Sequence, residues 1–306
     1  MTNLRLATRG SDLALWQAHR TQERLGPGAE LVIIESRGDQ DKSTELARFG
    51  SIGIFTVEVD RAVIAGDADV GVHSLKDMTT TLQDGVVLAG VLERGMIEDV
   101  LVAREPWTLD TLPRGARVGT GSQRRGAMLR AARPDLDIVP FRGNVPTRIA
   151  KVTGGEVDAT VLARAGIVRL GLERHISDVL PVTRFLPAVG QGIVGLTCRT
   201  DDTETIQRLK RDARDPEAWA SAQAERRFLA LLKGGCNAPV GGHATVSGDT
   251  MSLTGRVLSL DGKESIEGHI EGSVHDAVSL AEKLADDIAG RGGARLVEEA
   301  REAGAA

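Results

Sequence analysis

The spacing of hydrophobic residues predicts strands that alternate with helices through the first two thirds of the chain. Short apolar runs at Leu4–Thr8, Leu31–Ser36 and Asp69–Ser74 are typical of buried strands, whereas Ser11–Gly26 and Ile54–Gly66 repeat apolar residues at helical spacing. The same alternation restarts in the middle of the chain. Its expected strands lie at 116–122, 137–141 and 158–163, and its expected helices end near 132 and begin near 144. This order predicts parallel sheets covered by helices, in two similar α/β domains.

The last third of the chain follows a different pattern. A helix is expected at Glu217–Leu232. Alternating polar and apolar residues then predict a small antiparallel sheet from His243–Gly248, Ser252–Ser259 and Glu264–Gly272. A helix from about 274 to 288 and a short tail to residue 306 complete this part. The expected fold class is α/β, with two α/β domains and a smaller α+β domain at the C-terminus.

The composition is that of a soluble globular protein. Of 306 residues, 41 % are hydrophobic and 26 % are charged. No apolar run approaches the roughly 18 residues that would span a bilayer. The first ten residues, MTNLRLATRG, lack the basic start and apolar stretch of a signal peptide. Two cysteines form no disulfide framework. We expect a cytoplasmic protein with reduced thiols and no membrane partner.

Charge is distributed unevenly. The net charge is −5, yet eight arginines, no lysine and only two acidic residues lie between Arg114 and Arg148. The guanidinium group presents a rigid fork of donors that suits carboxylates and phosphates. Nucleic acid is a poor fit, because aromatic residues make up 3 %, tyrosine is absent and no basic stripe runs through the chain. The sequence therefore predicts a small anionic ligand.

Polar clusters follow three of the expected strands, where ligands of open α/β sheets bind: Arg9–Ser11, His73–Asp77 and Gly119–Gly126. Gly119–Gly126 combines a glycine-rich strand exit with hydroxyls and two arginines at a helix start, which favours an anion. It matches neither a dinucleotide fingerprint nor a lysine-containing phosphate loop. In His73–Asp77, Asp77 follows Lys76. A carboxylate among arginines can stabilise a developing cation or move a proton, although a plain surface ion pair is the alternative.

Cys236 is the strongest single candidate for covalent chemistry. It lies in the segment GGCNAPVG, whose glycines and proline predict a tight exposed loop. An accessible thiol on such a loop is a candidate nucleophile or attachment point, and a chance surface cysteine is the alternative. Cys198 lies in an apolar run and is expected to be buried and inert. His19 and His73 have no partners at metal-ligand spacing, so we expect both to be structural and no metal to bind.

Nine segments of the chain, taken in order, closely resemble the porphobilinogen deaminase family, also called hydroxymethylbilane synthases. The resemblance runs over essentially the whole chain and argues against the alternative that Cys236 is a chance surface cysteine. The segments are Ala7–Ala18, Ser36–Asp39, Val72–Asp77, Val118–Arg125, Arg142–Arg148, Leu162–Leu172, Leu186–Gly192, Ala224–Leu229 and Gly234–Gly241.

The resemblance implies a three-domain enzyme, with two domains like those of periplasmic binding proteins flanking a cleft. We expect domain 1 at 1–97 and 192–214, domain 2 at 98–191 and domain 3 at 215–306. It also implies a dipyrromethane cofactor held through a thioether to Cys236. Four porphobilinogen units would lose ammonia and couple head to tail on this primer, and hydrolysis would release the linear tetrapyrrole, hydroxymethylbilane. The family expectation is a monomer.

The resemblance assigns roles to individual residues of this chain. Asp77 and Lys76 are the expected catalytic residues: Asp77 would stabilise pyrrole N–H groups and the cationic azafulvene left when ammonia departs. The arginines would neutralise the acetate and propionate groups that accumulate as the chain grows. The expected cofactor-binding residues are Cys236, Arg124, Arg125, Ser122, Thr120, Lys76, Asp77 and Arg148, and the expected substrate-binding residues are Arg9, Ser11, Arg142, Arg169 and Gln191.

The chain departs from the family in places. Many members have two lysines in the glycine-rich loop that corresponds to Ser51–Glu58, and this chain has neither. Arg164 is also unusual and could supply replacement charge. Two alternatives remain open: a binding protein that clamps a small anion, with no covalent adduct, and a catalytically weakened deaminase that carries its cofactor.

Overall fold

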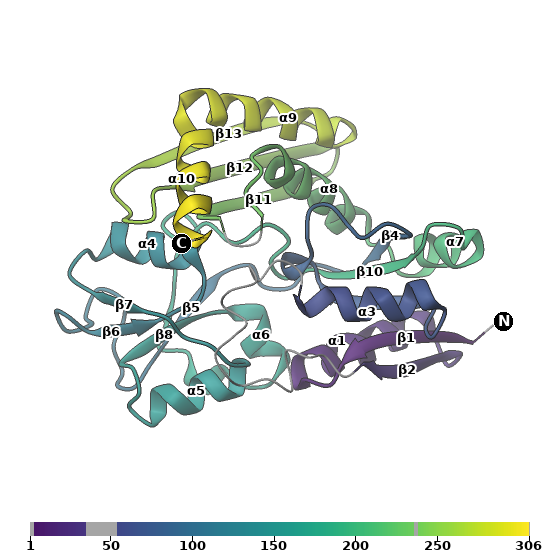
Figure 1. Ribbon diagram of the computed structural model, residues 1–306, viewed down its shortest axis with the longest axis horizontal. Coiled ribbons are helices and arrows are strands. Elements are labelled where there is room, and N and C mark those ends of the chain that lie inside the picture. The colour runs from purple at the N-terminus through teal and green to yellow at the C-terminus, as the bar shows by residue number, and fades with distance from the viewer. Residues whose placement is uncertain (1–2, 35–53, 236–237, 306) are drawn as a thin grey trace.

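The computed structural model describes residues 3–34, 54–235 and 238–305, which form three sheets with their covering helices (Figure 1). The first sheet has the strand order β2-β1-β3-β10-β4. Its strands are β1 (Leu4–Arg9), β2 (Ala29–Ile34), β3 (Val70–Ser74), β4 (Val86–Val91) and β10 (Val194–Arg199). The helices that pack against it are α1 (Asp12–Leu25), α3 (Ile54–Ala65) and α7 (Thr203–Asp212).

The second sheet has the strand order β7-β6-β8-β5-β9. Its strands are β5 (Asp99–Ala103), β6 (Arg117–Gly119), β7 (Asp137–Val139), β8 (Ala159–Ala163) and β9 (Asp178–Val179). Its helices are α4 (Gln123–Ala132), α5 (Val145–Thr153) and α6 (Arg164–Arg169), and a 3-10 turn η2 (Glu173–His175) precedes β9. The strands and helices expected in the two α/β parts are present, and β4, β5, β9, α6 and α7 are additional.

The prediction of parallel sheets is wrong in part, because both α/β sheets are mixed. Strand β1 is parallel to β2 and β3, and β6 is parallel to β7 and β8. Strand β10, however, runs antiparallel to β3 and β4, and β5 runs antiparallel to β8 and β9. Strands β5 and β10 follow the two crossovers between the sheets. The first crossover is 92–98 and the second is 180–193, and they meet where the Gly95 amide donates to the Gly192 carbonyl at 2.9 Å. Local hydrophobic spacing carries no information about strand direction, so only the long-range pairing decides it.

The third sheet is antiparallel in the order β11-β12-β13, as expected. Its elements are β11 (Val240–Ser247), β12 (Thr250–Leu258), β13 (Ser265–Ser273), η3 (Val274–Asp276), α8 (Pro216–Leu231), α9 (Ala277–Ile288), the turn η4 (Ala289–Gly293), which is kinked at Gly292 with φ of +106°, and α10 (Ala294–Ala305). The expected C-terminal tail is instead the helix α10, which buries Leu296, Val297 and Ala300 on one side. Figure 1 shows α10 reaching back toward α4.

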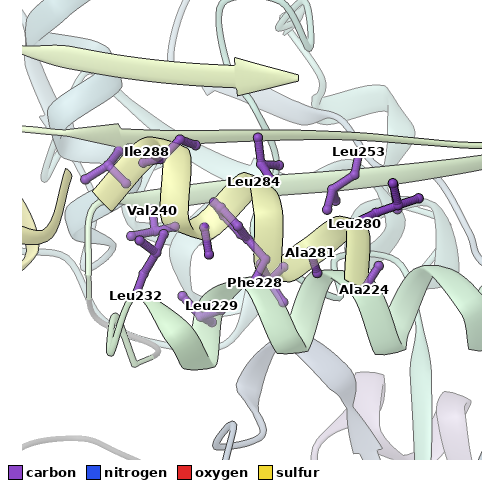
Figure 2. Packing of buried hydrophobic residues seen from close by; sticks show 14 of the residues in the cluster. Ala224, Phe228, Leu229, Leu232, Val240, Leu253, Leu280, Ala281, Leu284 and Ile288 are labelled. Atoms are coloured by element: carbon purple, nitrogen blue, oxygen red, sulfur yellow. The ribbon is translucent and has the colours of Figure 1, made fainter. Parts of the chain in front are cut away.

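Phe228 on α8 lies at the centre of the core of this third part. Its side chain is fully buried, with Leu280, Leu284 and Ile288 from successive turns of α9 in the same cluster (Figure 2). Helices α8 and α9 thereby cover the sheet together. This core holds the C-terminal end of α8, which leads into the segment that contains Cys236.

Glu225 on α8 joins the third part to the two crossovers. Its buried carboxylate accepts hydrogen bonds from the Gly190 and Ala244 amides, both at 2.7 Å, and pairs with Arg94. Buried charges persist when they are paired and hydrogen-bonded in this way.

The predicted fold class is confirmed: two α/β sheet–helix units and a smaller unit with a three-stranded sheet. The domain boundaries given above stay a prediction. Within the described ranges, no helix combines the length and the apolar character that crossing a membrane requires.

Candidate active site

Lys76 and Asp77 lie on η1 (Leu75–Asp77), a single 3-10 turn directly after β3. Leu75 is buried and anchors this turn, and its amide donates to the Ile193 carbonyl at 3.0 Å. Gly190 has a left-handed backbone with φ of +74°, and a Cβ there would lie 2.9 Å from the Leu75 side chain. The second crossover therefore packs directly on the turn that presents Asp77 to solvent.

Asp77 lines a cavity of about 90 Å³ between α1 and β3. Arg9 at the end of β1 and Ser11 at the start of α1 line the same cavity, so the structure brings these three expected site residues together. The floor is polar and ordered, because Gln17 donates to the Ser74 hydroxyl at 2.8 Å. The remaining lining residues are Leu13, Ala14, Thr56, Val72 and His73.

His73 is held in a buried hydrogen-bond network. Its Nε2 lies 2.9 Å from Asp60 Oδ1 and 3.1 Å from the Thr197 hydroxyl, and Thr197 itself donates to Asp60 at 2.8 Å. These contacts agree with a structural role. Cys198 is fully buried, and burial raises the pKa of its thiol to about 12, so it stays protonated and unreactive.

Arg124 and Arg125 at the start of α4 share one buried carboxylate, Asp99 at the start of β5. Arg124 Nη2 donates to Asp99 Oδ2 at 2.7 Å, and Arg125 Nε and Nη2 donate to Oδ1 at 3.1 and 2.7 Å. Burial alone would raise the pKa of Asp99, but the two guanidinium groups outweigh it and hold the pKa far below its ordinary value. The pair therefore carries about one net positive charge rather than two.

Asp99 was missed by the sequence analysis. The signal available was weak: an acidic residue at the beginning of the apolar run Asp99–Ala103. A charged residue that enters a fully buried strand needs a partner. Nothing in the local pattern indicates that the partners are two arginines on a helix some 25 residues away.

Lys76 and Arg148 lie in the electrostatic field of this arginine pair. Burial, followed by the charge of Arg125, lowers the pKa of Lys76 to about 8, although Asp77 and Asp99 act in the opposite direction. Burial lowers the pKa of Arg148 to about 10, with Arg125 and Arg142 acting in the same direction and Asp77 against it. Positive charge therefore exceeds negative charge around Asp77.

Two of the expected hydroxyls serve the local backbone. Ser122 is the N-cap of α4 and accepts from the Arg125 amide at 3.4 Å, and the Thr120 hydroxyl accepts from the Ser122 amide at 3.1 Å. This turn sets the direction in which α4 presents its arginines. Arg142 is exposed in the segment before α5, near Arg148.

Three other residues, Gln191, Arg169 and Arg164, do not line the cavity at Asp77. Gln191 is fully buried and donates to Asp99 Oδ1 at 3.1 Å and to the Ile97 carbonyl at 2.6 Å. Arg169 lines a second cavity that shares no residue with the one at Asp77. Arg164 pairs with Glu98 at 3.0 Å, so its charge is already partly compensated. The substrate-binding roles of Gln191 and Arg169 stay predictions.

Cys236 and residues 51–53 of the glycine-rich loop lie outside the described residues. Of Ile54 and Phe55 only the backbone, at the start of α3, is described. The described residues that precede and follow Cys236 are Gly235, with a left-handed φ of +57°, and the buried Ala238.

The charge around Asp77 fits a ligand that carries several carboxylates. Arg148 Nε is buried and has no acceptor among the described residues, and the pKa of Lys76 is depressed partly by neighbouring cations. Both observations indicate positive potential that this part of the chain leaves uncompensated. A dipyrromethane with acetate and propionate side chains would supply the missing negative charge.

Comparison with known proteins agrees with this chemistry. Residues 4–207 match the family model for the porphobilinogen deaminase dipyrromethane cofactor-binding domain, and residues 219–290 match the model for the porphobilinogen deaminase C-terminal domain. A porphobilinogen deaminase of Syntrophomonas wolfei is 41 % identical over 98 % of this chain and 100 % of its own length. That of Trichlorobacter lovleyi is 41 % identical over 97 % of this chain and 96 % of its own length.

Among solved structures, a periplasmic solute-binding protein from Pseudomonas putida F1 aligns with 74 % of this chain and 80 % of its own, at a TM-score of 0.41 and 11 % identity. The matches to both family models and to the full-length relatives show that the chain belongs to the porphobilinogen deaminase family of transferases, whose members carry a dipyrromethane cofactor.

Proposed function

We propose that this chain condenses four porphobilinogen units head to tail, with loss of ammonia, at the site around Asp77. The observation that carries the proposal is the single exposed carboxylate of Asp77 within a surplus of positive charge from Lys76, Arg125 and Arg148. The resulting linear product would be released by hydrolysis as hydroxymethylbilane. The relatives named above support this activity for the chain.

The arginines would bind and orient carboxylates. Arg124 and Arg125 are preorganised by Asp99, so little side-chain freedom is lost when an acetate or propionate group approaches. Lys76 and Arg148 would add charge that burial has left poorly solvated. When bound, the dipyrromethane supplies the pyrrole ring to which substrate units are joined.

Asp77 would act on the reacting unit itself. Departure of ammonia from the aminomethyl group leaves positive charge on the pyrrole, and a fixed carboxylate nearby lowers the energy of that state. The same carboxylate can accept the pyrrole N–H and receive the proton lost when the new carbon–carbon bond forms. Arg9 and Ser11 line the cavity beside it and would hold the carboxylates of the incoming unit.

Cys236 would tether the primer. Cys236 follows α8 in the sequence, and Glu225 on α8 contacts both crossovers through Gly190 and Arg94. A thioether to carbon survives many turnovers, whereas an ester would hydrolyse. We propose that domain 3 holds the primer while domains 1 and 2, with the boundaries given above, supply Asp77 and the arginines.

Intact-protein mass spectrometry tests the proposal directly. The purified protein should carry a mass excess equal to two linked pyrroles, and Cys236→Ser should abolish it, whereas Cys198→Ser should keep it because that thiol is buried and protonated. An unmodified native mass would contradict the tether. A primed protein without turnover would instead indicate a weakened deaminase.

The monomeric state and the cytoplasmic location are part of the same proposal. Sedimentation of the purified, primed protein should give a single species of one chain. A stable dimer would overturn the first expectation, and recovery in a membrane or extracellular fraction of the source cells would overturn the second.

A further inference from the structure

A cavity of about 330 Å³ lies where α1 packs on α6, apart from the cavity at Asp77. Helix α1 contributes Trp16 and Arg20, and α6 contributes Arg169. The first crossover closes one side. The other lining residues are Leu92, Glu93, Gly95, Met96, Ala165, Val168 and Val194.

Arg169 is the group in this cavity whose charge an anionic ligand would neutralise. Its guanidinium carbon lies 4.9 Å from the centre of the Trp16 ring, and Nη2 donates to the Gly192 carbonyl at 2.7 Å. Burial lowers its pKa to about 10. Across residues 3–34, 54–235 and 238–305, no carboxylate forms an ion pair with Arg169, so its charge is half-buried and uncompensated.

The charged residues at the rim of the cavity form only weak, exposed ion pairs. Arg20 pairs with Glu23 at 3.0 Å, and Glu93 pairs with Arg24 at 3.6 Å. All four side chains are between 44 % and 66 % exposed, so these pairs are worth little and can be exchanged for contacts with a ligand. The rim can therefore offer one further cation and one carboxylate to a molecule in the cavity.

The wall between these charges is apolar. Trp16 presents its indole, and Leu92, Met96, Val168 and Val194 surround it. Small-molecule sites combine such an apolar lining with a few polar groups that fix orientation. An occupant that matches this cavity is a small planar ring with acidic side chains for the arginines and an ammonium group for Glu93.

We propose that this cavity is a second binding site for porphobilinogen, held by Arg169, Trp16 and Glu93, in which a substrate unit waits outside the reaction site. The proposal rests on the proposed function for the identity of the ligand. The pyrrole has two carboxylates and an aminomethyl group, which match the two cations and the carboxylate of the cavity. A waiting site of this kind lowers KM and leaves kcat unchanged, because its contacts are made before the chemical step.

Binding is tested first by fluorescence. In the full chain with Trp107→Phe, Trp219→Phe and Asp77→Asn, Trp16 is the single tryptophan and turnover is slow. Titration with porphobilinogen should change its emission along a saturable curve. Adding Arg169→Gln should weaken the apparent affinity at least about tenfold, whereas Arg174→Gln, an exposed arginine outside the lining, should leave the curve unchanged.

Kinetics give the second test. In primed enzyme with Asp77 intact, Glu93→Gln and Trp16→Leu should each raise KM about three- to tenfold with kcat and primer mass unchanged. A flat Trp16 titration, or an unchanged KM in both variants, would overturn the waiting site. Protein that lacks a primer and turnover would contradict the proposed function instead, and the fluorescence titration would still decide whether the cavity binds the pyrrole.

Discussion

Asp99 and Arg125 form a buried ion pair in which two guanidinium nitrogens of Arg125 share one oxygen of Asp99, at 2.7 and 3.1 Å. The other oxygen accepts from Arg124 at 2.7 Å. One carboxylate thus orients two arginines from consecutive positions of a helix. Their side chains would otherwise repel each other and turn toward water.

Replacing Asp99 should therefore destabilise the fold. Asp99→Asn leaves two buried guanidinium groups without a counter-charge, and breaking a buried pair in this way costs about 3–5 kcal/mol of the free energy of unfolding. Denaturant unfolding at neutral pH measures it. Asp110→Asn, which removes an exposed pair with Arg184, is the matched control and should change stability by less than about 0.5 kcal/mol. Equal unfolding midpoints for the two variants would show that the buried ion pairs of Asp99 do not stabilise the fold.

Asp77→Asn should leave the fold intact and reduce turnover. The side chain is exposed, so its amide is tolerated, but the fixed negative charge is lost, which costs at least about a hundredfold in kcat. Primed protein and single-turnover kinetics provide the measurement. Asp84→Asn, an exposed carboxylate outside the Asp77 cavity, should behave like the parent protein. Near-normal turnover of the Asp77 variant would remove the residue from its proposed role.

Lys76 should lose its proton near pH 8 in protein that lacks a primer. Burial and Arg125 lower its pKa to about 8 from 10.5, so the fold disfavours the charged form. The penalty is complete below about pH 8, and stability is gained as pH rises from about 8 to about 10.5. In the Cys236→Ser background, Lys76→Met should therefore be more stable than the lysine form at pH 7, and the difference should shrink by pH 10. Thermal unfolding across this range measures it, and a difference independent of pH would rule out the depressed pKa.

Gly262 should be intolerant of substitution. It lies in the turn between β12 and β13 with φ of +75°, and a Cβ there would lie 2.5 Å from the Ala131 amide nitrogen and 2.6 Å from the Ala127 carbonyl, both on α4. Gly248 is the matched control, since it has φ of +59° and open space around its Cα. Gly248→Ala should cost about 1–2 kcal/mol for the left-handed backbone alone, and Gly262→Ala should cost at least about 1 kcal/mol more because the backbone of α4 must shift.

The Gly262 variant also probes the site. Helix α4 carries Arg124 and Arg125, so a shift of its backbone should raise KM as well as lower stability. If Gly262→Ala and Gly248→Ala unfold at the same denaturant concentration, the contact between the third sheet and α4 accommodates the added Cβ without a loss of stability, and the prediction is wrong.

Local sequence was sufficient for most of the elements. The apolar spacing of 12–25 and 54–65 predicts α1 and α3, and the alternation after residue 240 predicts the antiparallel third sheet. These patterns succeed because each element buries one side, and the period of its apolar residues is set by its own geometry. Helix α10 was missed because its three buried residues lie among small and charged residues that obscure the helical period of apolar positions.

The candidate site was likewise predicted in part from local sequence and decided in part by long-range contacts. The residue types of Lys76–Asp77 and Ser122–Arg125 at strand exits were enough to indicate anion chemistry and, through the resemblance, a deaminase. Which groups face a ligand was decided by contacts between distant segments. Asp99 neutralises part of the arginine charge, Gln191 is buried beside it, and Arg169 faces a separate cavity.

The amino-acid order by itself determined the helical and strand periods, the supply of arginines and the isolated thiol, because each is a property of neighbouring residues. The direction of β5 and β10, the partner of each arginine and the division into two cavities were decided only by the tertiary structure. These depend on the free energy of pairing and burying groups that lie far apart along the chain, and no local pattern encodes that.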